Sequence, residues 1–495
     1  MPPNVPPVAQ LEQALRRQDW TQAMQVADRL IARSRGSVPG WLGRAHCNLS
    51  IGRLRDAEVD LERLSRLAPQ DPAALLLRGI VHHRLGRSEQ AVGVLRPLLD
   101  RNSPNRVDVA VALAETLHRA ARHQELSDLM DRDDVWGDDP RATLFRARVI
   151  GRQDPEAAIT ALQAIARAAG SDVLRRITGF EAVRLLDKAG RYREAFDLAA
   201  LVHLHTTPRF DVDGLLGRVR EQRDLLARGA FRAPARVQPV QGVAMVVALP
   251  RSGTTLLEQM LDSHPDVSGI GEYDGVRTLA DGVVAAGAWP WGLGTMDVAR
   301  TLQDRYLEGA RVTQRAGTRW TFDKNLHAWT WLPAVAAVLP GAVCLHVARD
   351  PRDTAISLFL SNFHPVSFGW TRSLDDIRRV VEAERSLLPE SLATLGIPHE
   401  AIVYEDLVAD PVGHARRCLE RLGLAMADQV VQPERNHRTV LTLSHEQVRN
   451  PINARSIGRW RNYPWAFDEG WSHLAARHDA RRVHKAAQDA SAVQQ

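Results

Sequence analysis

Two hydrophobic patterns divide the chain. Between Gln10 and about Thr207, apolar residues recur at intervals of three and four, the spacing of amphipathic helices. From Val243 onward, short runs rich in valine and alanine alternate with helical stretches, an order typical of βαβ units around a parallel sheet. The patterns therefore predict an α + α/β protein, in which a helical domain (residues 1–207) precedes a P-loop-like α/β domain (residues 242–470).

The segments outside these domains have weaker patterns. Residues 208–241 read as a linker that holds one helix, around Leu215 to Ala230, followed by proline-containing stretches. Residues 471–495 form a C-terminal tail that is first basic and then polar, and that is either helical or frayed. The sequence suggests no role for this tail.

The helical region contains a repeat. Four short segments resemble one another and share an alanine: Ala23, Ala57, Ala91 and Ala195. The first three alanines are 34 residues apart, which is the length of a tetratricopeptide repeat. The second unit also has a tryptophan, a turn glycine and a terminal proline where that pattern expects them, at Trp41, Gly52 and Pro69.

These positions have a physical reason. A small residue lets two antiparallel helices approach closely, and each hairpin buries its apolar face only by stacking on its neighbour. We therefore predict a tetratricopeptide solenoid, in which the units between about Val107 and Val173 keep the length but have lost the signature. Generic helical hairpins are the alternative for those units.

Composition limits the function only weakly. With 495 residues, 44% of them hydrophobic and 25% charged, the chain reads as a soluble protein of several domains. Its three cysteines lie far apart without CxxC spacing, which argues against disulfides and zinc. The N-terminus has no secretory pattern, so we expect a cytoplasmic protein with no membrane partner. A net charge of +5 suits small anions and nucleic acid equally.

One loop has the composition of a phosphate-binding site. A predicted strand, Val243 to Leu249, leads into a short polar loop that opens an amphipathic helix. Backbone N–H groups and the helix dipole bind anions at such a junction. The lysine of a Walker A motif is missing, because Thr254 holds its place, and this disfavours ATP chemistry. The loop residues expected to bind the anion are Arg251, Ser252, Gly253, Thr254 and Thr255.

This loop, with Ser263-His264-Pro265 and Gly271-Glu272 after it, resembles the sulfotransferases that use 3'-phosphoadenosine-5'-phosphosulfate (PAPS). The nearest branch is that of the protein-tyrosine sulfotransferases, and the resemblance extends from about Val243 to Tyr463. It implies transfer of a sulfuryl group from PAPS to a hydroxyl acceptor, release of adenosine 3',5'-bisphosphate, and no metal. It also implies that the loop holds the phosphosulfate end, with Arg251 beside the transferred group.

Further matches imply the rest of the donor site. Arg349, at a strand end, and Ser357 resemble the pair that grips the 3'-phosphate, although the segment around Arg349 could alone be a charged helix cap. Lys324 resembles the lysine that bridges toward the leaving phosphate oxygen. Tyr404, in Tyr-Glu-x-Leu, resembles the aromatic residue that contacts the nucleotide.

The reaction also needs a base, because the acceptor hydroxyl must lose a proton. Glu272 resembles the catalytic glutamate of the tyrosine sulfotransferases. Another branch of the family uses a histidine, so His264 and His327 are the alternatives, and structural roles are favoured for both.

A late loop completes the resemblance. By this match Ser444 lies near the sulfuryl group and Arg459 near the nucleotide. The match is imperfect, because His445 stands where a second hydroxyl residue is expected and Arg459 replaces a lysine.

Two other functions stay open from the sequence. One is a P-loop kinase, and the other is a repeat scaffold whose C-terminal domain binds nucleotide without turnover. The acceptor could be a protein tyrosine, a carbohydrate or a small molecule. Stacked repeats would also offer a groove for a peptide or protein partner. We expect no nucleic-acid partner.

Overall fold

A computed structural model of the chain describes residues 6–51, 53–101, 105–168, 170–229, 237–287, 296–326, 328–436 and 450–493. The chain divides into two compact units, a first unit up to Ala164 and a second unit from Ile165 onward. None of the helices in these ranges combines the length and the hydrophobicity needed to cross a bilayer.

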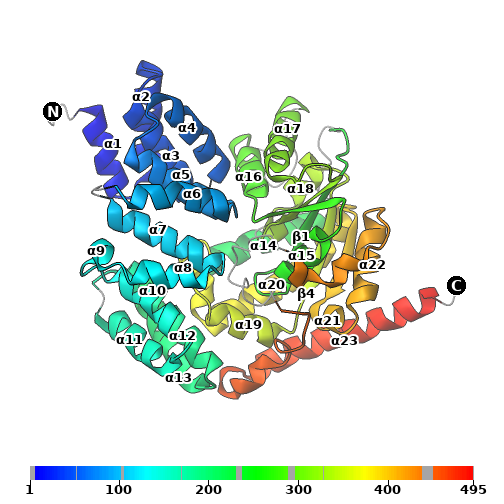
Figure 1. Ribbon diagram of the computed structural model, residues 1–495. Coiled ribbons are helices and arrows are strands. Elements are labelled where there is room, and N and C mark those ends of the chain that lie inside the picture. Colours follow the sequence, from blue (N-terminus) through cyan, green and yellow to red (C-terminus); the bar gives the residue numbers. More distant parts are fainter. Residues whose placement is uncertain are drawn as a thin grey trace. The chain divides into compact units, whose positions relative to one another are not determined.

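The first unit is a series of helices, and consecutive helices up to residue 130 pack against one another (Figure 1). The last helix continues across the division between the units. The helices are α1 (Pro7–Arg16), α2 (Trp20–Arg33), α3 (Val38–Ser50), α4 (Leu54–Leu67), α5 (Pro72–Arg84), α6 (Ser88–Leu99), α7 (Arg106–Arg119), α8 (His123–Met130), α9 (Asp133–Trp136), α10 (Arg141–Ile150) and α11 (Pro155–Ala168).

The helix starts repeat with the predicted period. Helices α2, α4 and α6 begin at residues 20, 54 and 88, and α3, α5 and α7 begin at residues 38, 72 and 106, so equivalent helices start 34 residues apart. The repeat alanines Ala23, Ala57 and Ala91 are completely buried. Gly79 is small for the same reason, because a Cβ there would overlap the side chain of Leu95 on the next helix. These features are consistent with the predicted repeats.

Arginine–carboxylate pairs connect successive hairpins of the first unit. The partners of each pair are 29 to 33 positions apart, close to one repeat. Each pair therefore joins one hairpin to the next. We call this set the arginine ladder: Arg87–Glu58, Arg96–Glu125, Arg122–Glu89, Arg132–Asp100, Arg141–Asp108 and Arg148–Glu115.

The second unit begins with three helices, α12 (Asp172–Lys188), α13 (Tyr192–Thr206) and α14 (Val212–Ala227). Helices α12 and α13 form a hairpin, in which Ala195 is completely buried. Helix α14, which lies in the predicted linker, packs against α20 (Leu374–Thr394). The last predicted hairpin and the helix of the predicted linker thus lie in the same compact unit as the sheet, and that unit begins at Ile165.

The sheet of the second unit has five parallel strands in the order β2-β3-β1-β4-β5. The prediction of an α/β domain with a parallel sheet is confirmed. The sequence did not predict β2, because its five residues include two glycines, which are rare in strands. The strands are β1 (Val243–Val247), β2 (Val267–Gly271), β3 (Trp320–Lys324), β4 (Val343–Ala348) and β5 (His399–Val403).

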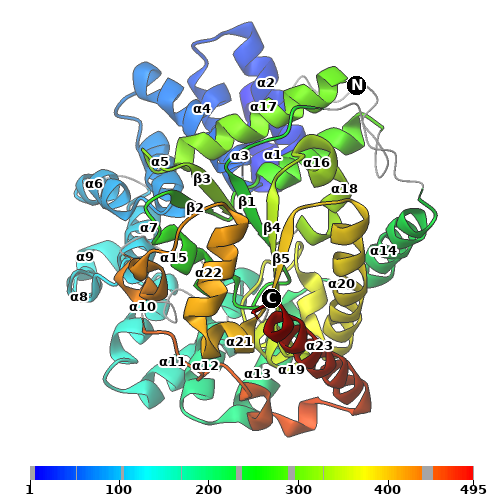
Figure 2. The ribbon, with the colours of Figure 1, turned by 90° about the vertical axis from the view of Figure 1, so that its right-hand side faces the viewer.

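Helices cover both faces of this sheet (Figure 2). Helices α15 (Thr254–Asp262) and α22 (Pro411–Arg421) share one hydrophobic core with alternate residues of β1 and β4. Helices α18 (Leu332–Val338) and α20 lie on the other face. The remaining helices are α16 (Gly275–Ala285), α17 (Met296–Thr313), α19 (Pro351–Phe359), α21 (Tyr404–Ala409) and α23 (Glu469–Val493). Because all strands run in one direction, their C-terminal ends meet at one edge, where ligands bind in such folds.

Candidate active site

The C-terminal edge of the sheet collects a predicted site residue from every strand. These residues stand at the end of a strand or in the loop that follows it, so the parallel pairing brings distant parts of the sequence to one edge. Lys324 is the last residue of β3 itself, whereas the sequence suggested that it follows a strand. The five residues, in chain order, are Arg251, Glu272, Lys324, Arg349 and Tyr404.

The loop between β1 and α15 has the conformation of an anion-binding turn. Arg251 and Gly253 have positive φ angles of 69° and 99°. A Cβ at Gly253 would overlap the ring of Tyr404, so both the backbone angle and the space require glycine there. The hydroxyl residues of the loop, Ser252, Thr254 and Thr255, are buried. The first N–H groups of α15 therefore open onto a tight, polar turn.

Arg251 lies among other cations. Its Nε donates a hydrogen bond to Ser357 Oγ at 2.7 Å. Burial lowers the pKa of Arg251 to about 9, and the charges of Arg349 and Arg459 contribute to the shift. Ser357, predicted to contact the 3'-phosphate together with Arg349, is thus also a hydrogen-bond partner of Arg251. Arg251 is thus a buried cation with other cations near it, and an anion bound at the loop would favour its charged form.

Arg349 connects three segments of the site. Its Nη1 donates to the backbone oxygen of Arg251 at 2.8 Å, and its Nη2 donates to the backbone oxygen of Ser456. Its guanidinium carbon lies 5.0 Å from the ring centroid of Tyr404. Arg349 therefore holds the phosphate loop, the late segment and the aromatic residue together.

Glu272 and Lys324 form an ion pair with Lys324 Nζ 2.7 Å from Glu272 Oε1. The Lys324 side chain is 1% exposed, whereas that of Glu272 is 51% exposed. Glu258 holds the backbone directly before Glu272, because its Oε1 accepts a hydrogen bond from the Gly271 N–H at 3.0 Å. A half-exposed carboxylate can meet an acceptor from outside, while the buried ammonium is confined to the site.

The neighbour of Lys324 along β3 is a buried carboxyl group. Asp323 is completely buried, and this burial raises its pKa well above its ordinary value. Tyr306 donates a hydrogen bond to Asp323 Oδ2 at 2.9 Å. Asp323 is therefore biased toward its neutral form, so it offsets little of the positive charge of Lys324.

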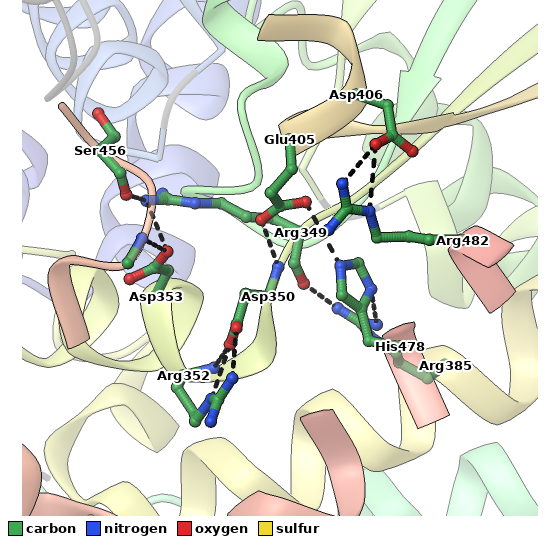
Figure 3. A network of polar contacts seen from close by, with 11 residues as sticks. Arg349, Asp350, Arg352, Asp353, Arg385, Glu405, Asp406, Ser456, His478 and Arg482 are labelled. Atoms are coloured by element: carbon green, nitrogen blue, oxygen red, sulfur yellow. Dashed lines mark hydrogen bonds and ion pairs between the residues drawn. The ribbon is translucent and has the colours of Figure 1, made fainter. Parts of the chain in front are cut away.

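A polar network that the sequence did not indicate holds the backbone around Arg349 (Figure 3). Glu405 accepts a hydrogen bond from the Asp350 N–H at 2.9 Å, and its other oxygen lies 3.3 Å from His478 Nε2. Arg385 donates to the backbone oxygen of Arg349 and lies 2.8 Å from His478 Nδ1. Glu405 stands beside Tyr404 in the sequence, which was the one available signal. His478 belongs to α23, so the tail that was given no role contributes to this network.

The late segment is held from α19 and α12. Asp353 on α19 accepts hydrogen bonds from the N–H groups of Gly458 and Trp460, at 2.7 and 2.9 Å. Arg459 forms an ion pair with Asp187 on α12, at 2.6 Å. The sequence predicted a role for Arg459 but no role for Asp187 or Asp353.

The other predicted residues are not all at this edge. His264 follows α15 at the end opposite the phosphate loop, where its Nε2 lies 3.1 Å from the Ala425 oxygen and its Nδ1 accepts from the Asp266 N–H. Both ring nitrogens thus contact backbone groups, which suits the structural role favoured for it. Ser444, His445 and His327 lie outside the described residues.

Comparison with known proteins relates the region of this site to a protein family. Residues 244–428 match the model of the Sulfotransferase family. A protein of Aquifex aeolicus, described only as uncharacterized, is 24% identical over 433 residues, which are 83% of this chain and 55% of that protein. Protein-tyrosine sulfotransferase 1 of Danio rerio is 24% identical over 242 residues, which are 43% of this chain and 63% of that enzyme.

Among solved structures, the sulfotransferase domain of the Synechococcus PCC 7002 olefin synthase is 20% identical and aligns with 50% of this chain and 98% of its own, at a TM-score of 0.34. The match covers 55% of the Aquifex aeolicus protein and 63% of the Danio rerio enzyme, so this chain spans about half to two thirds of the length of these two relatives. The region that matches the Sulfotransferase family, residues 244–428, contains Arg251, Glu272, Lys324 and Arg349.

Proposed function

We propose that the second unit transfers a sulfuryl group from PAPS to a hydroxyl acceptor. One observation carries the proposal: the carboxylate–ammonium pair of Glu272 and Lys324 stands at the same strand edge as the anion-binding loop and Arg349. A base and a group of cations at one edge suit a reaction that deprotonates a hydroxyl and releases a nucleotide through its phosphate oxygen. The family match of residues 244–428 supports the same reaction.

The donor set fits a bisphosphorylated carrier. Backbone N–H groups at the start of α15 and the guanidinium groups of Arg251 and Arg349 are typical ligands of phosphate and sulfate oxygens. We assign Arg251 and the loop residues 252–255 to the phosphosulfate end, and Arg349 with Ser357 to the 3'-phosphate. Tyr404 is assigned to the nucleotide, as is Arg459, and Ser444 to the sulfuryl group.

The chemistry of the chain's own residues follows from these positions. PAPS, when bound, supplies an activated sulfuryl group and a bisphosphate leaving group. Glu272 accepts the proton that the acceptor hydroxyl loses as its oxygen bonds to sulfur. Lys324 stabilises the negative charge that develops on the leaving phosphate oxygen, and its burial keeps water from screening that interaction.

The acceptor and the first unit belong to the same proposal. Tyrosine on a protein is the first acceptor to test, because the Danio rerio relative is named a protein-tyrosine sulfotransferase. Carbohydrates and small molecules follow. We propose that the helical hairpins of the first unit are tetratricopeptide repeats that bind a peptide or protein partner, and that the protein acts in the cytoplasm.

The decisive experiment offers labelled PAPS with a panel of peptides, glycans and phenols to the full chain. We expect label on one class of acceptor, and Glu272→Gln should lower kcat by about 10²- to 10⁴-fold while adenosine 3',5'-bisphosphate still binds. Glu420→Gln, at an exposed position on α22, is the matched control and should retain full activity. Binding without any labelled acceptor would favour the scaffold, and stabilisation by ATP instead would favour the kinase.

A further inference from the structure

The α12–α13 hairpin is attached to the segment that contains Arg459. The two oxygens of Asp187, in the last turn of α12, have different partners: Oδ2 lies 2.6 Å from Arg459 Nη2, and Oδ1 accepts a hydrogen bond from the Tyr463 hydroxyl. Tyr463 is completely buried, and Tyr192 on α13 packs edge-on against its ring at 5.4 Å between centroids. One carboxylate thus connects the hairpin to both ends of the 3-10 helix Arg459–Asn462.

The same hairpin also holds α19, which carries other residues of the site. Arg176 on α12 donates to the backbone oxygen of Phe363 at 2.7 Å, and His203 Nε2 on α13 lies 2.9 Å from the oxygen of Phe359. Phe196 stacks beside Phe359, with 4.8 Å between ring centroids. These contacts fix the hairpin to the C-terminal end of α19 and the residues after it. The Asp187 carboxylate, which the hairpin carries, therefore has a defined position.

The position of Asp187 is unfavourable for its own helix. A carboxylate in the last turn faces the negative end of the helix dipole, where a cation would be preferred. The side chains of Asp187 and Arg459 are only 20% and 23% exposed, so their contact is partly shielded from water. Burial lowers the pKa of Arg459, but the charge and hydrogen bond of Asp187 outweigh this and leave it raised. Asp187 therefore stabilises the charged form of Arg459. Arg459 in turn lies near enough to Arg251 for its charge to lower the pKa of Arg251.

We infer that Asp187 is a positioning residue for the PAPS donor site, which it serves by orienting Arg459, and that the α12–α13 hairpin is an integral part of this site. The inference rests on the proposed function. Neither Asp187 nor Arg459 lies in the region that matches the sulfotransferase family, residues 244–428, so the family comparison does not assign this role.

The test is Asp187→Asn in the full chain, which keeps the size of the side chain and removes its charge. Two effects oppose each other. Loss of a negative charge raises the local positive potential and should tighten anion binding, whereas loss of the orientation of Arg459 should weaken it. We expect orientation to dominate, because salt screens the partly exposed charge, and the Kd for adenosine 3',5'-bisphosphate in calorimetry at 0.15 M salt should rise about 10-fold.

The kinetic signature separates positioning from a general loss of structure. The KM for PAPS should rise in Asp187→Asn while the KM for the acceptor stays unchanged, and Asp187→Glu should restore most of the affinity. Glu194→Gln is the matched control, because Glu194 pairs with Arg191 on the same hairpin and is 53% exposed. This control removes one negative charge from α13 and should leave the Kd unchanged.

A double-mutant comparison identifies the partner through which Asp187 acts. In an Arg459→Gln background, Asp187→Asn should have no further effect on the Kd, because the two changes remove one interaction. If the second change again weakens binding 10-fold, or if Asp187→Asn alone leaves binding unchanged or tightens it, the inference is wrong. If the wild-type protein binds no adenosine 3',5'-bisphosphate, the proposed function fails and this inference fails with it. If the wild type binds the nucleotide but the variants do not behave as expected, only this inference fails.

Discussion

The arginine ladder of the first unit and the strand edge of the second unit use the same side chain in opposite ways. Every ladder arginine faces a carboxylate of a neighbouring hairpin. At the strand edge, Arg251 donates to a serine hydroxyl, and Arg349 donates to backbone oxygens, with the Asp353 carboxylate 3.9 Å from its Nη2. The charge of Arg349 also lies near enough to lower the pKa of Arg251. A cation that is paired with a carboxylate stabilises the fold, whereas several cations close together favour the binding of an anionic ligand.

The pKa shifts follow the same division. In the ladder, burial alone would raise the pKa of Glu115, but the charges of Arg148 and Arg119 outweigh it and hold that pKa well below its ordinary value. At the strand edge, burial and neighbouring cations lower the pKa of Arg251 to about 9. The charge of Glu115 is therefore stabilised within the first unit itself, whereas an anion bound at the strand edge would favour the charged form of Arg251. The comparison predicts that ladder variants change stability and strand-edge variants change binding.

The largest effect is expected for Arg349→Gln. Loss of the guanidinium should weaken the binding of adenosine 3',5'-bisphosphate by about 100-fold or more, and loss of its hydrogen bonds to the backbone oxygens of Arg251 and Ser456 should lower the free energy of unfolding by about 1–3 kcal/mol. Calorimetry and chemical denaturation measure the two quantities on one sample. The comparison breaks if the variant loses stability while its affinity is retained.

Glu115→Gln should have the next largest effect, this time on stability. Glu115 Oε1 accepts from Arg119 at 2.8 Å and its Oε2 accepts from Arg148 at 2.7 Å, and the Arg148 side chain is 9% exposed. Removing the carboxylate charge takes a charged partner from two arginines, at a cost of about 2 kcal/mol in the unfolding of the first unit. Nucleotide affinity should not change, and a weaker affinity would contradict the division.

The pH dependence of this difference sharpens the comparison. The pKa of Glu115 is lower in the folded protein than in the unfolded chain, so the unfolded chain binds more protons as the pH falls below about 4.5. The stabilisation by Glu115 should be complete above that pH and decline as the pH falls through the folded pKa. Denaturation of wild type and Glu115→Gln from pH 7 to pH 3 should therefore show converging stabilities.

Gly253→Ala tests whether the conformation of the loop, and not charge alone, makes the strand edge a binding site. The substitution places a Cβ at a φ of 99° and against the ring of Tyr404, so we expect about 10-fold weaker nucleotide binding and a loss of about 1–2 kcal/mol in stability. Gly423→Ala is the control, with a φ of 66° and open space around its Cβ. It should lose some stability at unchanged affinity.

The smallest effect is expected for Arg132→Gln, in an exposed part of the ladder. Arg132 pairs with Asp100, whose side chain is 63% exposed, so water already screens the pair. We expect a loss of only about 0.5 kcal/mol in thermal or chemical unfolding. A loss as large as that of Glu115→Gln would mean that the ladder acts as one cooperative network and not as separate pairs.

Sequence patterns determined the fold class and much of the site. Hydrophobic spacing distinguished helices from the βαβ region, and the alanines Ala23, Ala57 and Ala91 revealed the period at which the helices start. The phosphate loop was predicted because a polar loop joins an apolar strand to a helix, whereas Lys324 and Arg349 were predicted from the resemblance to the sulfotransferases. Parallel strands deliver all of them to one edge. Their roles in catalysis stay predictions until the variants are measured.

Tertiary structure alone decided which distant groups meet. Nothing near Asp187 or His478 in the sequence indicates Arg459 or Glu405 as their partners, and nothing local indicates that the α12–α13 hairpin belongs with the sheet. The physical reason is that hydrophobic periodicity and turn chemistry depend on a few neighbouring residues, so the sequence of each segment is enough to predict them. A contact between surfaces hundreds of residues apart depends on how both surfaces pack, so it appears only in the folded chain.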